Sequence, residues 1–256
     1  MKIKNQFDLT GKVAIITGSS KGIGASIARG LAEFGAKVVV SSRKQEAVDA
    51  VVASLKKDGL EATAIACHVG DDAQLKNLVN QTIAKYGGID ILINNAATNP
   101  VFEPIVASTS EAFDKIMSIN VKACMLLSNY CYPSMKSRGG GSIVNIASVE
   151  GITPSFGMGM YSISKAALIM LTKSMAKEWG DDKIRVNAIC PGLIQTKFSS
   201  ALWQNEDILN KVVGDLPAAR MAQPDEMAGL AIFLASNASS YSTGAVHVAD
   251  GGYLVK

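Results

Sequence analysis

Short apolar runs and longer amphipathic segments alternate along the whole chain. The apolar runs are rich in β-branched residues and predict buried strands at 12–17, 36–42, 61–67, 89–94, 142–148, 184–190 and 245–252. Apolar residues at helical spacing predict helices at 25–34, in a segment ending near Tyr86, and at 110–135, 160–180 and 224–235. Buried strands that alternate with helices indicate an α/β fold with a parallel, doubly wound sheet, in which ligands bind at the carboxyl ends of the strands.

A glycine-rich turn joins the first predicted strand to the first helix. The sequence GSSKGIG, residues 18–24, follows the strand directly. Gly18 would permit the tight turn, while Gly22 and Gly24 would let the backbone approach a pyrophosphate held at the helix N-terminus. An ordinary tight turn is the alternative, but the position between strand and helix favours a dinucleotide site. We therefore expect a Rossmann-like sheet of about seven strands with helices on both faces.

The end of the second predicted strand bears on which dinucleotide is bound. NAD sites usually carry an acid there for the ribose 2′-OH, whereas this strand ends in SSRK, residues 41–44. Arg43 would meet a 2′-phosphate, and Lys21 in the glycine turn would add a second positive charge. Either cation alone is also consistent with an ordinary surface residue. The missing acid and the two cations together favour NADP(H).

Tyr161 and Lys165 stand four residues apart in YSISK, downstream of Ser148. Residues at this spacing share one face of a helix. A phenol titrates near ~10, and a positive charge about 4 Å away supplies about 4 kcal/mol at an effective dielectric of about 20. We therefore expect Lys165 to lower the pKa of Tyr161 enough for general acid–base catalysis. A surface tyrosine and a solvated lysine are the alternative.

Together these motifs resemble the short-chain dehydrogenase/reductase family, and the resemblance covers essentially the whole chain. Four motifs stand in the family's order: TGSSKGIG at 17–24, NNAA at 94–97 with alanine for the family's last glycine, the tetrad Asn120, Ser148, Tyr161 and Lys165, and PGLIQT at 191–196. Within the family, SSRK, CHVG at 67–70 and NNAATNP resemble NADP(H)-dependent carbonyl and retinal reductases related to mammalian peroxisomal enzymes.

The resemblance implies a role for each member of the tetrad. Tyr161 would donate a proton to a carbonyl during reduction or remove one from an alcohol during oxidation, and Ser148 would hydrogen-bond the carbonyl oxygen. Lys165 would lower the pKa of Tyr161 and hold the cofactor ribose, and Asn120 would keep a water in a relay from Lys165 to solvent. A mid-helix Asn is mildly unfavourable, so Asn120 is also consistent with a satisfied interior amide that bends the helix.

The same resemblance places the cofactor. Ala96 would line the adenosine pocket, Asn95 would brace the fourth strand, and the backbone N–H of Ile194 would meet the nicotinamide carboxamide. His68 departs from the pattern, because many relatives carry an Asp there; we expect an adenine-pocket or packing role rather than a metal ligand. The full set of cofactor-binding candidates is Gly18, Ser20, Lys21, Gly22, Ile23, Gly24, Ser42, Arg43, His68, Val69, Asn95, Ala96, Tyr161, Lys165, Pro191, Gly192, Ile194 and Thr196.

Composition excludes several other functions. With 256 residues that are 48% apolar, the chain is able to bury one large core, so we expect a single domain at 1–256. A net charge of +3 without a basic run predicts neither a nucleic-acid nor a membrane partner. The four cysteines show no CxxC spacing, so we expect free thiols and no metal site. Without a signal peptide, an apolar span of about 20 residues or a peroxisomal tripeptide, a soluble cytoplasmic protein is expected.

Two apolar segments would flank the tetrad. The first is 149–160, and the second is 193–223, which we expect to act as a substrate lid. Their apolar residues suit a moderately hydrophobic ketone, aldehyde or secondary alcohol, although core packing is the alternative for any one side chain. Glu150 would meet a polar substrate group or face solvent. The Tyr161 helix is apolar nearly all round, which predicts a second subunit against it, and the family resemblance implies a homotetramer.

The expected function is hydride transfer between NADP(H) and a ketone, aldehyde or secondary alcohol. The alternative enzyme is a 3-ketoacyl-thioester reductase of fatty-acid synthesis, which needs a basic surface for an acidic carrier protein; Arg138 and Lys177 are the candidates for it. A redox-inactive nucleotide-binding sensor is the third hypothesis. A sensor of that kind is expected to have lost one or more of the catalytic residues, but Ser148, Tyr161 and Lys165 are all present.

Overall fold

The computed structural model describes residues 2–214 and 216–255 and confirms the doubly wound α/β fold. Within this part of the chain, one seven-stranded sheet has the order β3-β2-β1-β4-β5-β6-β7, and every neighbouring pair is parallel. The strands are β1 (Val13–Thr17), β2 (Lys37–Ser42), β3 (Ala62–Ala66), β4 (Ile91–Asn94), β5 (Gly141–Ile146), β6 (Ile184–Pro191) and β7 (Val246–Ala249). The strand order reverses between β1 and β4, so a ligand crevice is expected at their carboxyl ends.

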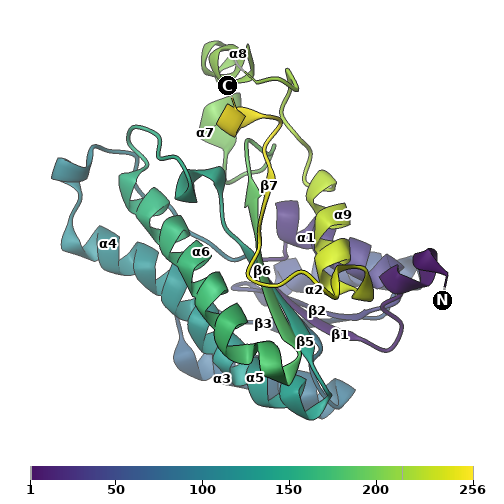
Figure 1. Cartoon of the computed structure of the whole chain (residues 1–256). Helices are drawn as coiled ribbons and strands as arrows, with labels where there is room; N and C mark the ends of the chain where they lie inside the picture. Colours follow the sequence, from purple (N-terminus) through teal and green to yellow (C-terminus); the bar gives the residue numbers. More distant parts are fainter. Residues whose placement is uncertain (1, 215, 256) are drawn as a thin grey trace.

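Helices cover both faces of the sheet (Figure 1). On one face, α1 (Gly22–Glu33), α2 (Gln45–Lys57) and α9 (Glu226–Ala235) share an apolar core with the sheet. On the other, α3 (Asp72–Tyr86), α5 (Ala123–Ser137) and α6 (Gly159–Trp179) do the same. The short helices α7 (Ser200–Trp203) and α8 (Glu206–Gly214) lie near the C-terminal end of the chain, at the top of Figure 1. Single 3₁₀ turns occupy Ile3–Phe7, Ile105–Ala107, Val149–Gly151, Gly180–Asp182, Asn237–Ser239 and Tyr253–Val255.

The helix expected at 110–135 is not continuous. It divides into α4 (Ser110–Met117), a π-helical turn at Ser118–Lys122, and α5. Such turns occur mostly as single interruptions within α-helices, often at functional sites. The turn carries Asn120, whose side chain is bonded to a neighbouring loop rather than to solvent. A helical periodicity in the sequence does not distinguish these two geometries over five residues.

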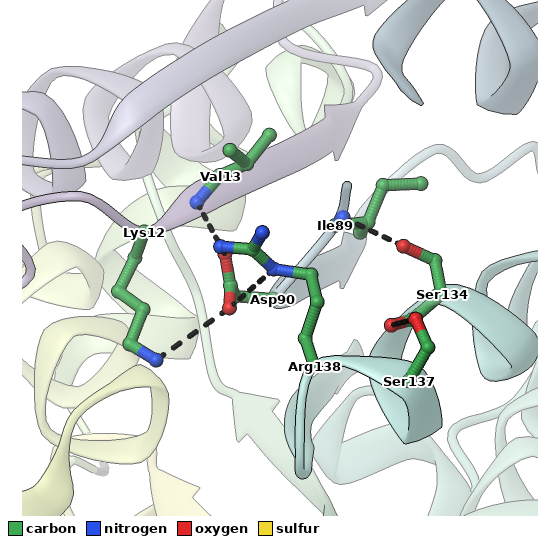
Figure 2. Close-up of polar contacts among 7 residues, drawn as sticks. All are labelled: Lys12, Val13, Ile89, Asp90, Ser134, Ser137 and Arg138. Atoms are coloured by element: carbon green, nitrogen blue, oxygen red, sulfur yellow. Dashed lines mark hydrogen bonds and ion pairs between the residues drawn. The ribbon is translucent and has the colours of Figure 1, made fainter. Parts of the chain in front are cut away.

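A buried carboxylate ties the amino ends of the strands together (Figure 2). Asp90 is only 3% exposed; it accepts hydrogen bonds from the Val13 N–H (2.9 Å) and from the Arg138 guanidinium at both oxygens (3.0 and 2.9 Å). Lys12 Nζ lies 3.5 Å from the same carboxylate. Arg138 also covers Gly88, where an added Cβ would lie 2.4 Å from its Cδ. The partly exposed Arg138 guanidinium is therefore paired with Asp90 rather than free for the carrier-docking surface considered above.

Candidate active site

The glycine turn packs directly against the segment that follows β4. A Cβ added at Gly18 would lie 2.9 Å from Ala96 Cα, and one at Gly24 would lie 2.4 Å from Asn95 Nδ2. Asn95 Nδ2 donates to the carbonyls of Thr17 (2.9 Å) and Gly18 (3.1 Å). Any side chain at either glycine would therefore separate the two turns. Asn95 joins β1 to β4, which agrees with the bracing expected from the sequence.

The N-terminus of α1 has the properties of a phosphate site. Its N-cap, Lys21, makes no side-chain capping bond, whereas Asp71 caps α3 and Thr109 caps α4. The first N–H groups of a helix have no intrahelical partner and, with the helix dipole, attract anions. A Cβ at Gly22 would lie 3.3 Å from Thr196 Cγ2, so the segment after β6 faces this turn. Ile23 follows, half-buried against the core under α1.

The end of β2 lies beside the glycine turn and carries free positive charge. Ser42 and Ser20 are joined by their hydroxyls at 3.1 Å. Their chain neighbours Arg43 and Lys21 are exposed, and within residues 2–214 and 216–255 neither side chain makes a hydrogen bond or an ion pair. No carboxylate stands at the strand end. This donor set fits a dinucleotide that carries an additional phosphate.

A small gap, too narrow to hold a water molecule, lies beside the ends of β1 and β4. Its lining residues are Thr17, Val69, Asn94, Ala96, Ile119, Ala123, Cys124 and Leu127. His68 precedes Val69, and its Nδ1 accepts the N–H of Gly70 at 3.1 Å, so the ring is used within its own turn. The described residues contain no group of three His, Cys, Asp or Glu side chains placed to hold a metal ion.

The segment after β6 reaches the same edge. Pro191 ends the strand beside Ala249, and a Cβ at Gly192 would lie 2.7 Å from Asp250 Cα. Ile194 forms an isolated parallel bridge with Ala222, which leaves the Ile194 N–H without a hydrogen-bond partner among the described residues. A buried side chain with an unpaired backbone donor at this edge fits the carboxamide contact expected from the sequence.

Tyr161 and Lys165 lie on one face of α6, as the spacing predicts. The Lys165 Nζ is 5.5 Å from the centroid of the Tyr161 ring. Both residues are buried: Lys165 is 2% exposed and Tyr161 is 7% exposed. Lys165 Nζ donates to the Ile146 carbonyl at the end of β5 (2.7 Å). Burial lowers the pKa of Lys165 to about 8. The ammonium is therefore held under the ring by its bond to the sheet.

The Tyr161 pKa shifts in the direction opposite to the lowering expected from the sequence. Burial raises the pKa of the phenol above its ordinary value, and the hydrogen bond with the Ser148 side chain opposes that rise. The negative charge of Glu150 raises the pKa further, and the Cys190 thiolate would do so at high pH. The Lys165 ammonium faces both the Ile146 carbonyl and the Tyr161 ring.

Asn120 is joined to the Tyr161 helix through Ser164. The fully buried Asn120 side chain accepts from the Thr98 N–H (2.8 Å) and donates to the Thr98 carbonyl and to Ser164 Oγ (3.0 Å each). Ser164 Oγ in turn donates to the Tyr161 carbonyl (2.7 Å). Asn120 is therefore a buried amide with hydrogen-bond partners within the protein, as in the alternative considered from the sequence. The amide also fixes the turn of α6 that carries the phenol.

Comparison with known proteins identifies the scaffold. A family model described as Enoyl-(Acyl carrier protein) reductase matches residues 18–254. The chain is 47% identical over 244 residues to Dehydrogenase/reductase SDR family member 4 of Oryctolagus cuniculus, which covers 95% of this chain and 94% of that protein. The chain belongs to the short-chain dehydrogenase/reductase family. It is therefore an oxidoreductase by family, and the resemblance inferred from the sequence is confirmed.

Solved structures of similar short-chain dehydrogenase/reductases share the fold. A gluconate 5-dehydrogenase from Burkholderia cenocepacia J2315, in complex with NADP and tartrate, has a TM-score of 0.94 at 33% identity, covering 98% of both chains. A 7α-hydroxysteroid dehydrogenase, complexed with NADH and 7-oxo glycochenodeoxycholic acid, has a TM-score of 0.94 at 35% identity, again covering 98% of both chains. These neighbours carry different nicotinamide dinucleotides, so the cofactor preference rests on residues of this chain.

Several residues at the site were not singled out from the sequence of this short-chain dehydrogenase/reductase. Thr17 Oγ1 accepts the N–H groups of Asn95 (3.0 Å) and Ala96 (3.1 Å), and its place at the end of the first strand is a usable signal. Ser164 lies inside YSISK, next to Lys165. Phe198, by contrast, is one of the apolar residues of the segment expected from the sequence to flank the tetrad, and its ring contacts the Tyr161 ring at 5.8 Å between centroids, with 41° between the planes. No local pattern indicates that last contact, because the two residues belong to separate elements.

Proposed function

We propose that this protein is an NADP(H)-dependent short-chain dehydrogenase/reductase that interconverts a ketone or aldehyde and the corresponding alcohol. The observation that carries the proposal is the buried pair Tyr161 and Lys165, held with Ser148 at the carboxyl edge where the glycine turn opens. A phenol with a hydroxyl partner and a fixed cation beneath it is a proton donor for a carbonyl oxygen. A redox-inactive sensor would not need these three groups together.

Each member of the tetrad has a proton or positioning role in this proposal. Tyr161 Oη protonates the carbonyl oxygen during reduction, and Ser148 Oγ hydrogen-bonds the same oxygen. Ser148 Oγ accepts the Glu150 N–H (3.1 Å) and is hydrogen-bonded to Tyr161, so a carbonyl oxygen bound between them would take over the serine's hydroxyl bond. Lys165 supplies the positive charge, and Asn120 fixes the helix turn while serving the expected relay. NADP(H), when bound, supplies or accepts the hydride.

The direction of the Tyr161 pKa shift favours reduction. A phenol whose pKa is raised above its ordinary value stays protonated at neutral pH. Reduction needs the protonated form, and oxidation needs the phenolate. Reduction therefore falls as pH rises through the folded-state pKa, while oxidation becomes faster over the same range. We propose that Tyr161 acts as the proton donor of the reduction at neutral pH.

The cofactor would be held by the residues that frame the carboxyl edge. In the proposal the open N-terminus of α1 binds the pyrophosphate, and Arg43 with Lys21 binds the 2′-phosphate. Tyr161 and Lys165 hold the nicotinamide ribose, and the Ile194 N–H binds the carboxamide. The remaining cofactor-binding candidates would form the walls of the cofactor site. They are Gly18, Ser20, Gly22, Ile23, Gly24, Ser42, His68, Val69, Asn95, Ala96, Pro191, Gly192 and Thr196.

Replacing Arg43→Asp tests the choice of dinucleotide. The carboxylate would repel a 2′-phosphate and accept a ribose 2′-OH, so NADPH binding should weaken by about 10- to 100-fold while NADH binding is retained or improved. Cofactor titration by fluorescence measures both constants. Lys57→Asp, the same charge change at an exposed site at the far end of α2, is the matched control. Equal effects on NADPH in the two variants would reject Arg43 as the phosphate ligand.

Exposed apolar side chains near the tetrad support a hydrophobic substrate. Phe198 packs on Tyr161 yet is 54% exposed, and Phe156 in the loop after Ser148 is 82% exposed. Phe102 covers Gly157 of that same loop. We propose that segment 193–223 is the substrate lid; Asp215 within it lies outside the described residues. Trp203 Nε1 donates to the Thr196 carbonyl (3.0 Å), so α7 is hydrogen-bonded to the beginning of this segment.

A panel of substrates separates the two enzyme hypotheses. NADPH oxidation would be followed with apolar ketones, aldehydes and acetoacetyl thioesters. We expect the ketones and aldehydes to be preferred, because Arg138 is paired with Asp90 and leaves Lys177 without its expected partner in a docking surface. A strong preference for the thioesters would favour the 3-ketoacyl-thioester reductase instead. No turnover with any member would contradict the carbonyl proposal.

We further propose a homotetramer with α6 in an interface. The described surface around α6 carries exposed apolar side chains at Phe113, Met125, Ile163 and Met170. Met170→Asp should reduce the assembly mass measured by light scattering, because a buried charge at an interface is costly. Lys57→Asp again serves as the control and should leave the mass unchanged. A monomeric wild type, or an unchanged mass in Met170→Asp, would contradict the proposal.

Cellular location also remains a proposal. No helix in the described part of the chain has the length and hydropathy needed to cross a bilayer. Cys67, Cys124, Cys131 and Cys190 are free and buried. Because thiols persist in a reducing compartment, we propose a cytoplasmic location.

A further inference from the structure

Glu150 lies between the catalytic serine and the helix of the catalytic tyrosine, and its carboxylate has three donors. It accepts the N–H of Ser155 (2.9 Å), the hydroxyl of Ser155, and the hydroxyl of Ser162 (2.8 Å). Ser162 is the residue after Tyr161 on α6. Ser155 also contacts the Tyr253 hydroxyl at 3.3 Å, which brings the C-terminal segment to the same point. Neither expectation for Glu150, a substrate contact or a solvated side chain, describes these bonds.

The backbone of Glu150 is bonded to the catalytic residue as well. Its N–H donates to Ser148 Oγ at 3.1 Å. One residue therefore contacts the serine through its backbone and the tyrosine helix through its side chain. The loop it closes, residues 149–158, carries the exposed Phe156 and reaches Gly157, which lies under Phe102. A shift of this loop would move Ser148 relative to Tyr161.

We propose that Glu150 is a positioning residue of the active site, whose carboxylate holds the loop after Ser148 against the helix that carries Tyr161. This inference rests on the proposed function for its catalytic consequence. Its structural part concerns only contacts within the loop and α6. A displacement of about 1 Å between catalytic groups costs up to about 100-fold in rate, so the bonds to Ser155 and Ser162 bear directly on turnover.

The charge of Glu150 gives the proposal a second, separable consequence. The charged or titratable groups around the Tyr161 phenol are Lys165 on α6, Glu150 after β5 and Cys190 at the end of β6. Burial raises the pKa of Cys190 to about 11, so that thiol is neutral at physiological pH. Glu150 is then the anion that disfavours the phenolate, and it is not among the groups acting on Lys165.

Two substitutions separate the bonds from the charge. Glu150→Ala removes both, and should lower kcat/KM for carbonyl reduction by about 10- to 100-fold while the Kd for NADPH stays within about twofold. Hydrogen exchange of residues 149–158 should become faster in the same variant. Glu150→Gln keeps the shape and one acceptor oxygen for the Ser155 N–H and the Ser162 hydroxyl, places an NH2 group against Ser155 Oγ, and removes the charge. The pH at which alcohol oxidation rises should then move lower by about half a unit, because the phenolate is less disfavoured.

Glu103→Gln is the matched control. Glu103 lies in the neighbouring loop, where its N–H donates to the Gly157 carbonyl (3.0 Å), and its side chain makes no hydrogen bond or ion pair to any described residue. It should change neither the exchange nor the pH profile. Unchanged exchange in Glu150→Ala, or an unchanged pH profile in Glu150→Gln, would overturn the proposal. The exchange measurement needs no turnover, so it decides the role of Glu150 in the loop even if the wild type reduces none of the carbonyls tested.

Discussion

Tyr161→Phe should lower turnover by about 10³-fold or more while NADPH still binds with nearly unchanged affinity. The substitution removes one hydroxyl and keeps the ring that packs on Phe198 and lies above Lys165. General acid catalysis contributes about 10²- to 10⁴-fold, and loss of its proton donor removes that contribution. Steady-state reduction of the best ketone from the panel, together with NADPH titration, measures the two quantities.

Tyr130→Phe is the control for this experiment. Tyr130 is a tyrosine of α5 whose hydroxyl donates to the Asp72 carboxylate on the outer side of the molecule. Its removal should leave kcat and KM within about twofold, since surface substitutions have small effects. Near wild-type turnover in Tyr161→Phe would reject proton transfer by this phenol, whatever the identity of the substrate.

Asp90→Ala should lower the free energy of unfolding by about 2–4 kcal/mol. The change leaves the buried Val13 N–H unpaired and removes both bonds to the partly exposed Arg138 guanidinium (Figure 2). The cost reflects the unpaired groups left behind rather than the net value of the ion pair. Urea denaturation followed by circular dichroism measures it, provided the m-value is unchanged.

Asp181→Ala provides the comparison for Asp90. Asp181 is exposed, and its side chain makes no hydrogen bond or ion pair with the described residues. Its substitution should leave the denaturation midpoint nearly unchanged. Equal midpoints for the two variants would show that Asp90 does not hold the amino ends of β1 and β4 together.

Local patterns in the sequence were sufficient to predict the sheet and the edge where the site lies. Buried strands such as KVAIIT are short, β-branched and bounded by glycine, so their order and alternation with helices could be read directly. The glycine turn was equally readable, because Gly18 and Gly24 are required by close packing on Ala96 and Asn95. The spacing of Tyr161 and Lys165 predicted their shared helix face correctly.

Features that depend on distant residues could not be predicted in this way. The Lys165 ammonium donates to the Ile146 carbonyl, nineteen residues away in sequence, and no local pattern indicates that bond. The pairing of Asp90 with Arg138 spans 48 residues and removes a candidate docking cation. The Glu150 carboxylate accepts hydrogen bonds from Ser155 and Ser162 only because the loop after Ser148 turns back onto α6. In each case tertiary packing selects among partners that the sequence leaves equivalent.

The widened turn at Ser118–Lys122 has a consequence for the whole helical arm that contains it. A π turn accommodates one more residue than an α turn, so it offsets the angular phase of every later side chain by about 100° relative to an uninterrupted α-helix. Without that offset, Leu127 and Cys131 would rotate away from the sheet face they now cover. The inserted residue therefore sets the rotational register of α5 as well as the position of Asn120.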